Sequence, residues 1–555
     1  MTTPASSGTM PPMLTLINTN RMVPAIGPIG LEYVAEAAAR AGIDVSILDL
    51  ALCDDPDRAL REHLAGRGAT LIGLSFRNVD DCFWPSAQWF VPGLADLVQK
   101  IRGLSDAPIV LGGVGFSVFA KEIVEYTGAD FGIHGDGELA TIALYRQLQN
   151  GRQFETVGGL VWRSQGEIRA NRPAWPAEIS LPARREMFDN RAYFARGGQC
   201  GFETKRGCNR RCLYCADPLS KGPVPRSRKP AEIADEIESL LAQGIDVLHT
   251  CDAEFNVPRR HALAVCEEMI RRSLGEKVRW YAYLAVTPFD AELADALRRA
   301  GCVGINFTGD SASETMLSTY RQQHRAEDLA AAVRLCRENG MKVMIDLLLG
   351  GPGETPQTAA ETIRFIKQIA PDCAGASLGI RVYPGTGMVD VLRGCVGSPH
   401  SLGGIVKRSL RSLAMADFPC ARPSPRPTGL DDATLLTHPL RRQGPLDAQP
   451  GMRRRYAGPI DLFQPTFYIS PALGPEPARL IKDLIAGDQR FFEPMAEGAP
   501  TRNDALGSPE QSDPESTGHN YNDNTDLVEA IRQGARGAYW DILRHLRGSR
   551  PQEGL

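Results

Sequence analysis

The chain has 555 residues and a formal net charge of −4, with 62 basic side chains against 66 acidic ones. That balance excludes the basic excess typical of a general nucleic-acid binder, so we expect no nucleic-acid partner. No apolar run approaches the roughly 18–20 residues that span a bilayer, so we expect no membrane segment. The first twelve residues also lack the pattern of a signal peptide.

Cysteine usage indicates a reducing compartment. Thirteen cysteines are scattered along the chain, unlike the dense framework of a small disulfide-rich secreted protein. Several, such as Cys266, Cys302 and Cys336, lie in apolar or helical settings, where cysteine behaves as a small hydrophobic residue. We therefore expect a cytoplasmic protein.

The N-terminal part, residues 12–150, alternates short apolar runs with amphipathic stretches. The predicted strands are residues 14–18, 44–50, 70–76, 107–111 and 131–134. Strands and helices at this spacing predict an α/β, doubly wound, Rossmann-like domain with a parallel sheet. Ligands of such sheets bind at the carboxyl ends of the strands, where this chain carries Arg77, Gly113, Gly115 and Ser117.

Residues 151–196 form a predicted linker with several prolines and a short hairpin around residues 160–163. A second strand–helix series occupies residues 197–390. Its predicted strands are residues 201–206, 247–250, 279–284, 303–307, 342–348 and 376–381. Six such units predict a partial, TIM-like (β/α)6 barrel, whose site lies at the carboxyl ends of the strands.

The strand–helix rhythm ends in residues 391–555, which we expect to form a mainly helical or irregular cap over the substrate. Residues 473–486 and 526–547 are predicted helices. Residues 419–450 are predicted to be an irregular segment, and the polar residues 497–524 are expected to be disordered. Residues 463–471 are aromatic and apolar. They are compatible with a substrate-cavity wall and also with a core segment of the cap.

Three cysteines follow the first predicted strand of the barrel. Cys208, Cys212 and Cys215 are spaced C-x3-C-x2-C, so one tight loop can present three thiolates. Thiolates are the usual ligands of iron–sulfur clusters, and a cubane usually takes four, so three leave one iron open. The alternative is a zinc knuckle, but no fourth Cys or His follows within thirty residues of Cys215.

With the barrel and the preceding Rossmann-like domain, this motif resembles the cobalamin (B12)-binding-domain radical S-adenosylmethionine (SAM) enzymes, a group that contains many methyltransferases. The resemblance covers roughly residues 14–390. It implies a [4Fe–4S] cluster on the three cysteines, SAM on the open iron, and cobalamin. In this group the cluster cleaves SAM to a 5′-deoxyadenosyl radical, which abstracts hydrogen from the substrate before methyl transfer.

The same resemblance implies which residues contact SAM. Tyr214 corresponds to the aromatic residue near the adenine, and Glu254 can accept hydrogen bonds from the ammonium group. Later strand ends add Asp310, Ser311, Gly350 and Arg381. The competing interpretations are a packing role for Tyr214, a solvated loop acid for Glu254 and a structural ion pair for Arg381.

The N-terminal domain lacks the D-x-H-x-x-G motif that supplies a histidine to cobalt in many B12 proteins. Gly113, Gly115 and Ser117 would let the corrin lie against backbone, and we expect Arg77 near the lower face of the cobalt. The alternatives are that Arg77 pairs with Asp80 or Asp81, and that the domain binds nothing.

The resemblance implies a cobalamin-dependent methyltransferase that acts on a small specialised metabolite, with an electron donor such as flavodoxin or ferredoxin. Two rivals stay open. The first is non-methylating chemistry on SAM, either a rearrangement or the transfer of its 3-amino-3-carboxypropyl group as in arsinothricin biosynthesis. The second is a non-catalytic corrinoid or cluster-binding sensor.

Overall fold

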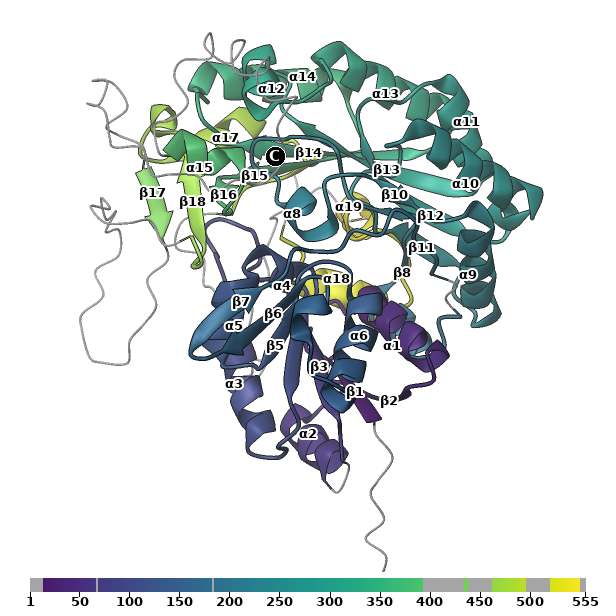
Figure 1. Ribbon diagram of the computed structural model, residues 1–555. Coiled ribbons are helices and arrows are strands. Elements are labelled where there is room, and N and C mark those ends of the chain that lie inside the picture. Colours follow the sequence, from purple (N-terminus) through teal and green to yellow (C-terminus); the bar gives the residue numbers. More distant parts are fainter. Residues whose placement is uncertain are drawn as a thin grey trace, which may run out of the picture.

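The computed structural model describes residues 13–65, 68–181, 184–392, 462–495 and 520–549, and the backbone of residues 434–437. Most of residues 419–450 and 497–524, for which irregular and disordered structure was expected, lies outside the described residues. Two α/β units face each other, the N-terminal one in purple and blue and the second in teal (Figure 1). Within these residues no helix is long and apolar enough to cross a membrane.

The N-terminal unit is built on a seven-stranded sheet of order β2-β1-β3-β4-β5-β6-β7. Its strands are β1 (Met13–Asn18), β2 (Asp44–Asp49), β3 (Leu71–Ser75), β4 (Ile109–Gly112), β5 (Phe131–Ile133), β6 (Leu160–Ser164) and β7 (Glu167–Ala170). The first five are parallel, as predicted, and the β6–β7 hairpin adds to β5 antiparallel. The helices are α1 (Ile29–Arg40), α2 (Pro56–Leu64), α3 (Val91–Arg102), α4 (Val114–Val118), α5 (Ala120–Thr127) and α6 (Gly137–Gln149).

The second unit is an open parallel sheet of order β19-β15-β14-β13-β12-β11-β8. Its strands are β8 (Cys200–Phe202), β11 (Val247–Thr250), β12 (Arg279–Ala285), β13 (Cys302–Asp310), β14 (Lys342–Leu349), β15 (Cys373–Leu378) and the short β19 (Phe491–Phe492). The helices between them are α9 (Pro230–Ala242), α10 (Arg259–Arg271), α11 (Ala291–Arg299), α12 (Glu314–Tyr320), α13 (Ala326–Glu338) and α14 (Pro356–Ile369). The strands run in chain order without closing, which confirms the partial barrel.

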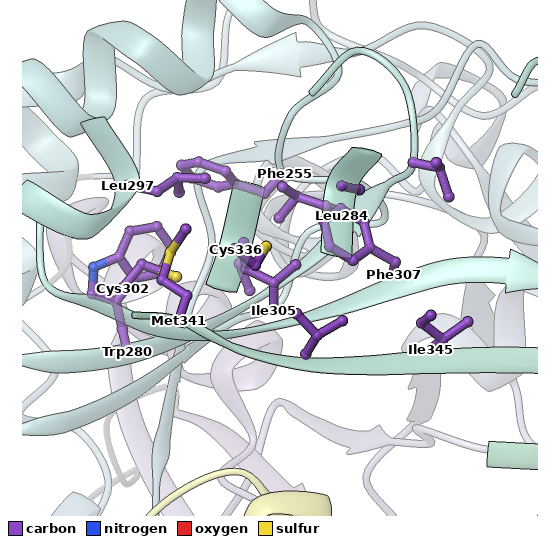
Figure 2. Packing of buried hydrophobic residues seen from close by; sticks show 14 of the residues in the cluster. Phe255, Trp280, Leu284, Leu297, Cys302, Ile305, Phe307, Cys336, Met341 and Ile345 are labelled. Atoms are coloured by element: carbon purple, nitrogen blue, oxygen red, sulfur yellow. The ribbon is translucent and has the colours of Figure 1, made fainter. Parts of the chain in front are cut away.

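The barrel core lies between the sheet and its outer helices. Figure 2 shows Trp280, Leu284, Ile305, Phe307 and Ile345 from three successive strands packed together. Each is fully or almost fully buried. A strand that is covered on both faces has a nearly continuous apolar sequence, which explains why these strands could be predicted from the sequence.

The sixth barrel strand differs from its predicted range. It covers Cys373–Leu378 rather than residues 376–381, because Gly379 has a φ of +87° and interrupts the extended backbone. Arg381 lies on β16 (Ile380–Arg381), which pairs with β18 (Thr466–Ile469) in a separate sheet that also contains β17 (Thr434–Thr437). The aromatic stretch around residue 467 therefore includes a strand.

The C-terminal prediction of one helix over residues 526–547 is wrong. Two helices form, α18 (Thr525–Arg532) and α19 (Tyr539–Ser549), and α17 (Pro477–Ile485) precedes them. Gly534 and Gly537, with φ values of +104° and +151°, separate the two because neither conformation continues a helix. Helix α18 lies between the two units (Figure 1).

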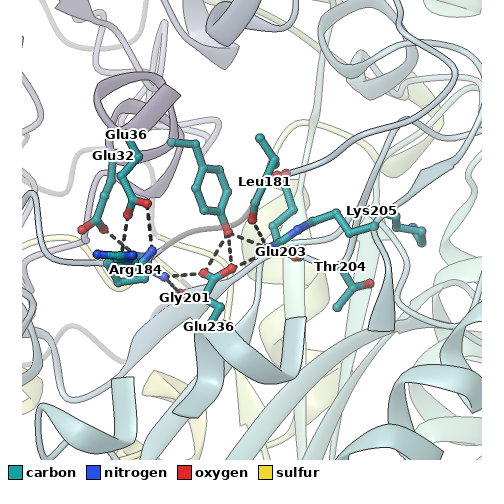
Figure 3. Close-up of polar contacts among 12 residues, drawn as sticks. Glu32, Glu36, Leu181, Arg184, Gly201, Glu203, Thr204, Lys205 and Glu236 are labelled. Carbon is teal, nitrogen blue, oxygen red and sulfur yellow. Dashed lines mark hydrogen bonds and ion pairs between the residues drawn. The ribbon is translucent and has the colours of Figure 1, made fainter. Parts of the chain in front are cut away.

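A buried ionic network joins the units. The Arg185 guanidinium contacts Glu32 of α1 at 2.6 Å and Glu236 of α9 at 2.8 Å, and all three side chains are at most 1% exposed. Figure 3 shows these carboxylates together with Glu36, which accepts backbone N–H groups of Arg184 and Arg185. Charged groups removed from water require such partners, so the network links the N-terminal unit to the second unit.

Candidate functional site

The three cysteines lie in the loop after β9 (Lys205–Arg206), which pairs antiparallel with β10 (Arg226–Ser227). Gly207 permits this turn, since its φ is +84° and a Cβ there would lie 2.3 Å from the carbonyl oxygen of Val224. The Cys208 N–H donates to the Gly222 carbonyl at 3.1 Å, and the Leu213 N–H donates to that of Tyr320 at 3.0 Å. Backbone bonds therefore fix both sides of the loop.

The thiols are held in an environment that opposes their ionisation. Burial raises the pKa of all three thiols, Cys208, Cys212 and Cys215. The pKa of Cys212 rises to about 12. A cluster would supply the positive charge that thiolates require here. Among the described residues no three His, Cys, Asp or Glu side chains converge on one ion, whereas a cubane takes cysteines on separate irons. The donor set fits a [4Fe–4S] cluster.

Asp310 and Tyr214 meet beside this loop. The Tyr214 hydroxyl donates to Asp310 Oδ2 at 2.6 Å, and the Gln322 amide donates to the same oxygen and to Cys212 Sγ at 3.6 Å. Asp310 has a φ of +56°, next to an irregularity in the β13–β14 register. Burial raises the pKa of Asp310 to about 7. Strained backbone and a perturbed acid are typical of functional sites.

Glu254, from the loop after β11, lies near enough to the cysteine loop for its charge to raise the pKa of Cys208 and of Cys212, beside the larger effect of burial. Its Oε1 accepts the Thr308 hydroxyl at 3.0 Å, whereas its Oε2 is buried and has no hydrogen-bond partner. Burial raises its pKa to about 7, while Arg210 and Lys205 act in the opposite direction. A buried carboxylate oxygen with no donor fits a site that receives a ligand donor, such as the ammonium of SAM.

Three other expected SAM contacts have protein partners. Ser311 is fully buried, with its hydroxyl 2.8 Å from that of Thr362. Gly350 adopts a φ of +89°, and its carbonyl accepts the Ser470 N–H at 2.8 Å. Arg381 contacts Asp80 at 2.7 Å, as the structural alternative predicted, and lies over the Tyr383 ring.

A cavity of about 670 Å³ opens between the N-terminal sheet and the barrel. It is bordered by the carboxyl ends of β1, β3 and β4, by the barrel interior and by the C-terminal segment. Among the expected corrin contacts, Arg77, Gly113 and Ser117 line it, and a Cβ on neighbouring Gly112 would meet no atom within 4 Å. A flat backbone cradle facing a large cavity fits a tetrapyrrole.

Gly113 and Gly115 also have a packing function. A Cβ on Gly113 would lie 2.5 Å from the Phe76 carbonyl oxygen, and one on Gly115 would lie 2.8 Å from the Asn78 backbone. Both glycines therefore let α4 approach the loop after β3, and Gly115 is not among the residues that line the cavity. Ser117 Oγ donates to the Gly113 carbonyl and accepts the Gly135 N–H, both at 3.0 Å.

Arg77 is exposed to two cavities, the large one and a neighbouring one of about 260 Å³. Its Nη1 donates to Asn78 Oδ1 at 2.7 Å. The alternative that Arg77 pairs with Asp80 or Asp81 is wrong. Asp80 binds Arg381, and Asp81 accepts the Ser86 hydroxyl and backbone N–H groups.

Sequence reasoning missed the aromatic wall of the large cavity. His249 and Tyr283 come from neighbouring barrel strands, with ring centroids 5.0 Å apart, and Tyr521 and Tyr539, 6.0 Å apart, come from the C-terminal segment. Two further residues near the cluster loop, Lys205 and Gln322, were also missed. Lys205 stands only three residues before Cys208, which is the one local signal that could have identified it.

Known proteins resemble this chain in both units. Residues 202–366 match the radical SAM superfamily, and residues 18–144 match the B12 binding domain. A tryptophan 2-C-methyltransferase of Streptomyces laurentii is 30% identical over 68% of this chain and 74% of its own length.

Solved structures extend the likeness to nearly the whole chain. The radical SAM methyltransferase TsrM of Kitasatospora setae, with tryptophan and a SAM analogue, has a TM-score of 0.79 at 30% identity, over 97% of this chain and 99% of its own. A second TsrM structure, with cobalamin and a [4Fe–4S] cluster, has a TM-score of 0.77 at 28% identity, over 97% and 98% of the chains.

Proposed function

Because the chain belongs to the cobalamin-dependent radical SAM methyltransferases, we propose that it methylates a carbon atom of a tryptophan-like aromatic amino acid. Its cofactors are a [4Fe–4S] cluster, SAM and cobalamin. When bound, cobalamin supplies a methyl group carried on cobalt, and the protein supplies orientation and exclusion of side reactions. The similarity to a tryptophan methyltransferase motivates the substrate class, and the cavity wall supports it.

The aromatic wall of the large cavity is the observation that carries the substrate assignment. Tyr283, Tyr521, Tyr539 and Trp540 line it together with His249. Such rings favour edge or offset contacts with another ring and provide polar groups at their edges. Since Tyr521 and Tyr539 belong to residues 391–555, we assign that region the role of a substrate cap over residues 12–150 and 197–390.

The residues around the cysteine loop divide into ligands and supports. Cys208, Cys212 and Cys215 hold the cluster, while Tyr214, Asp310, Glu254 and Gly350 surround SAM. Ser311 and Arg381 support those contacts through Thr362 and Asp80, since their own polar groups are already bonded.

The substrate proposal is tested by a product assay. Protein reconstituted with cluster and cobalamin is incubated with SAM and tryptophan, and the products are separated by mass spectrometry. Methyltryptophan together with S-adenosylhomocysteine is the expected result. Methylthioadenosine would indicate transfer of the aminocarboxypropyl group instead, and consumption of SAM without a methylated indole would contradict the substrate class.

We propose that Arg77 would lie near the lower face of the cobalt when cobalamin is bound. Its exposure at the sheet edge, in both cavities, supports this role. In an Arg77→His variant, a histidine at that place should coordinate cobalt, so the electron paramagnetic resonance spectrum of bound cob(II)alamin should gain nitrogen superhyperfine splitting. An unchanged spectrum at full cobalamin content would contradict the placement.

An electron donor such as flavodoxin or ferredoxin completes the proposal, together with a cytoplasmic location, where free cysteines stay reduced. The described cysteines are all free thiols. Reduction of the reconstituted cluster by flavodoxin, followed in its visible spectrum, tests the donor.

A further inference from the structure

The loop that carries the three cysteines is closed at its base by a short hairpin. Strands β9 and β10 pair Arg206 with Arg226, so both ends of residues 207–225 leave from one place. The side chains of these two arginines are 9% and 4% exposed. Because burial removes them from water, both guanidinium groups require acceptors inside the protein.

Two of those acceptors belong to the N-terminal unit. Glu138, in the first turn of α6, accepts both Nη groups of Arg206, at 3.0 and 2.7 Å. Asp136 accepts both Nη groups of Arg226, one of them at 3.2 Å, and lies 3.5 Å from Arg206 Nη1. A third acid, Glu203 of the second unit, accepts Arg206 Nε at 2.7 Å. Charge-assisted, partly bidentate bonds therefore tie the hairpin to the N-terminal unit.

A further contact lies on the other side of the cysteines in the chain. His134 Nε2 is 2.7 Å from the carbonyl oxygen of Leu219, which belongs to α8 (Asp217–Lys221), just after Cys215. This histidine and the two acids of the N-terminal unit come from one segment, residues 134–138, between β5 and the first turn of α6. The segment therefore contacts the chain both before and after the three cysteines.

Residues 134–138 also border the large cavity that fits the corrin. All of them except His134 line it, as does Arg206. The Gly135 N–H donates at 3.0 Å to the hydroxyl of Ser117, which is one of the expected corrin contacts. A continuous series of hydrogen bonds and ion pairs thus runs from the corrin cavity to the base of the cysteine loop. Coupling between two sites travels through networks of this kind.

We propose that Asp136 and Glu138 are positioning residues that couple the two cofactor sites, so that the cluster and cobalamin each favour the binding of the other. The inference rests on the proposed function, since it needs both cofactors, and adds a dependence between them. Burial alone would raise the pKa of Glu138, but the charge and hydrogen bonds of Arg206 outweigh it and lower that pKa. The carboxylate is therefore ionised when it holds the hairpin.

Equilibrium binding of hydroxocobalamin to cluster-free and cluster-loaded protein, followed in the visible corrin spectrum, tests the coupling. Cluster-loaded wild type should bind about 5- to 150-fold more tightly than cluster-free wild type, the usual range for coupled sites. Glu138→Gln keeps the shape of the side chain without its charge and should abolish most of this difference. Arg206→Lys keeps the buried charge but loses the bidentate geometry, so its affinity ratio should be intermediate.

The matched control is Glu32→Gln. Glu32 is also a buried carboxylate of the N-terminal unit, but its partners are Arg185 and Asn190 and not the hairpin. This variant should be less stable than wild type and keep the wild-type affinity ratio. Circular dichroism and iron content confirm that each variant is folded and loaded.

Three outcomes would overturn the inference. Wild type that binds hydroxocobalamin equally well with and without the cluster has no coupling. A wild-type ratio in Glu138→Gln, or in Arg206→Lys should Glu138→Gln not fold, would show that these ion pairs do not carry it. Equal loss of the ratio in Glu138→Gln and Glu32→Gln would assign the coupling to the docking of the units as a whole. Wild type that binds no cobalamin or retains no iron would instead contradict the proposed function.

Discussion

At the residue scale, Asp310 makes the ligand-free site a source of pH-dependent instability. Its folded pKa is about 7, against an ordinary value of 3.8, because burial disfavours the carboxylate. Between these values the unfolded chain releases the proton that the folded chain retains, so stability is full below pH 3.8 and falls as pH rises toward 7. Asp310 therefore favours the folded state only when protonated.

An Asp310→Asn variant should remove that dependence. Asparagine tolerates the positive φ and can still accept from Tyr214 and Gln322. We expect the cluster-free variant to be more stable than wild type at pH 8, on the order of 2–4 kcal/mol, with a smaller gain at pH 5. Urea unfolding at both values measures this. An equal difference at the two pH values would contradict the assigned pKa.

At the element scale, the short helix α4 fixes the loop after β3 that carries Arg77. Gly115→Ala would place a methyl group 2.8 Å from the Asn78 backbone, so the loop must move. Overpacking of this kind costs about 1–3 kcal/mol. We therefore expect both a lower melting temperature and weaker retention of cobalamin on gel filtration.

Gly548→Ala is the matched control, because Gly548 is exposed on α19 with no atom near its Cβ position. Alanine favours a helix over glycine by up to about 1 kcal/mol, so this variant should be as stable as wild type or slightly more stable. Unchanged cobalamin retention in Gly115→Ala would show that the loop is not positioned by α4.

At the scale of the whole molecule, the two units depend on the buried Arg185 network. Arg185→Met would leave Glu32 buried without its cation and Glu236 with Arg228 alone, and breaking a buried pair costs about 3–5 kcal/mol. We expect a large fall in the free energy of unfolding. Arg259→Met removes ion pairs with exposed Asp290 and Glu292 and should cost no more than about 1 kcal/mol. Equal losses in the two variants would show that the network does not hold the units together.

The amino-acid sequence was enough to predict the order of strands and helices in the two α/β units, the three-cysteine loop and its place after the first barrel strand. These features depend on the spacing of residues along the chain and on the period of the apolar residues, which differs between helices and strands. Only the tertiary structure decided that Asp80 forms its ion pair with Arg381, which is 301 residues away from it in the sequence, and not with Arg77. It also decided that Gln322 reaches Cys212 and that the C-terminal tyrosines line the cavity. Such pairings depend on which surfaces are buried against each other, and no local pattern encodes that choice.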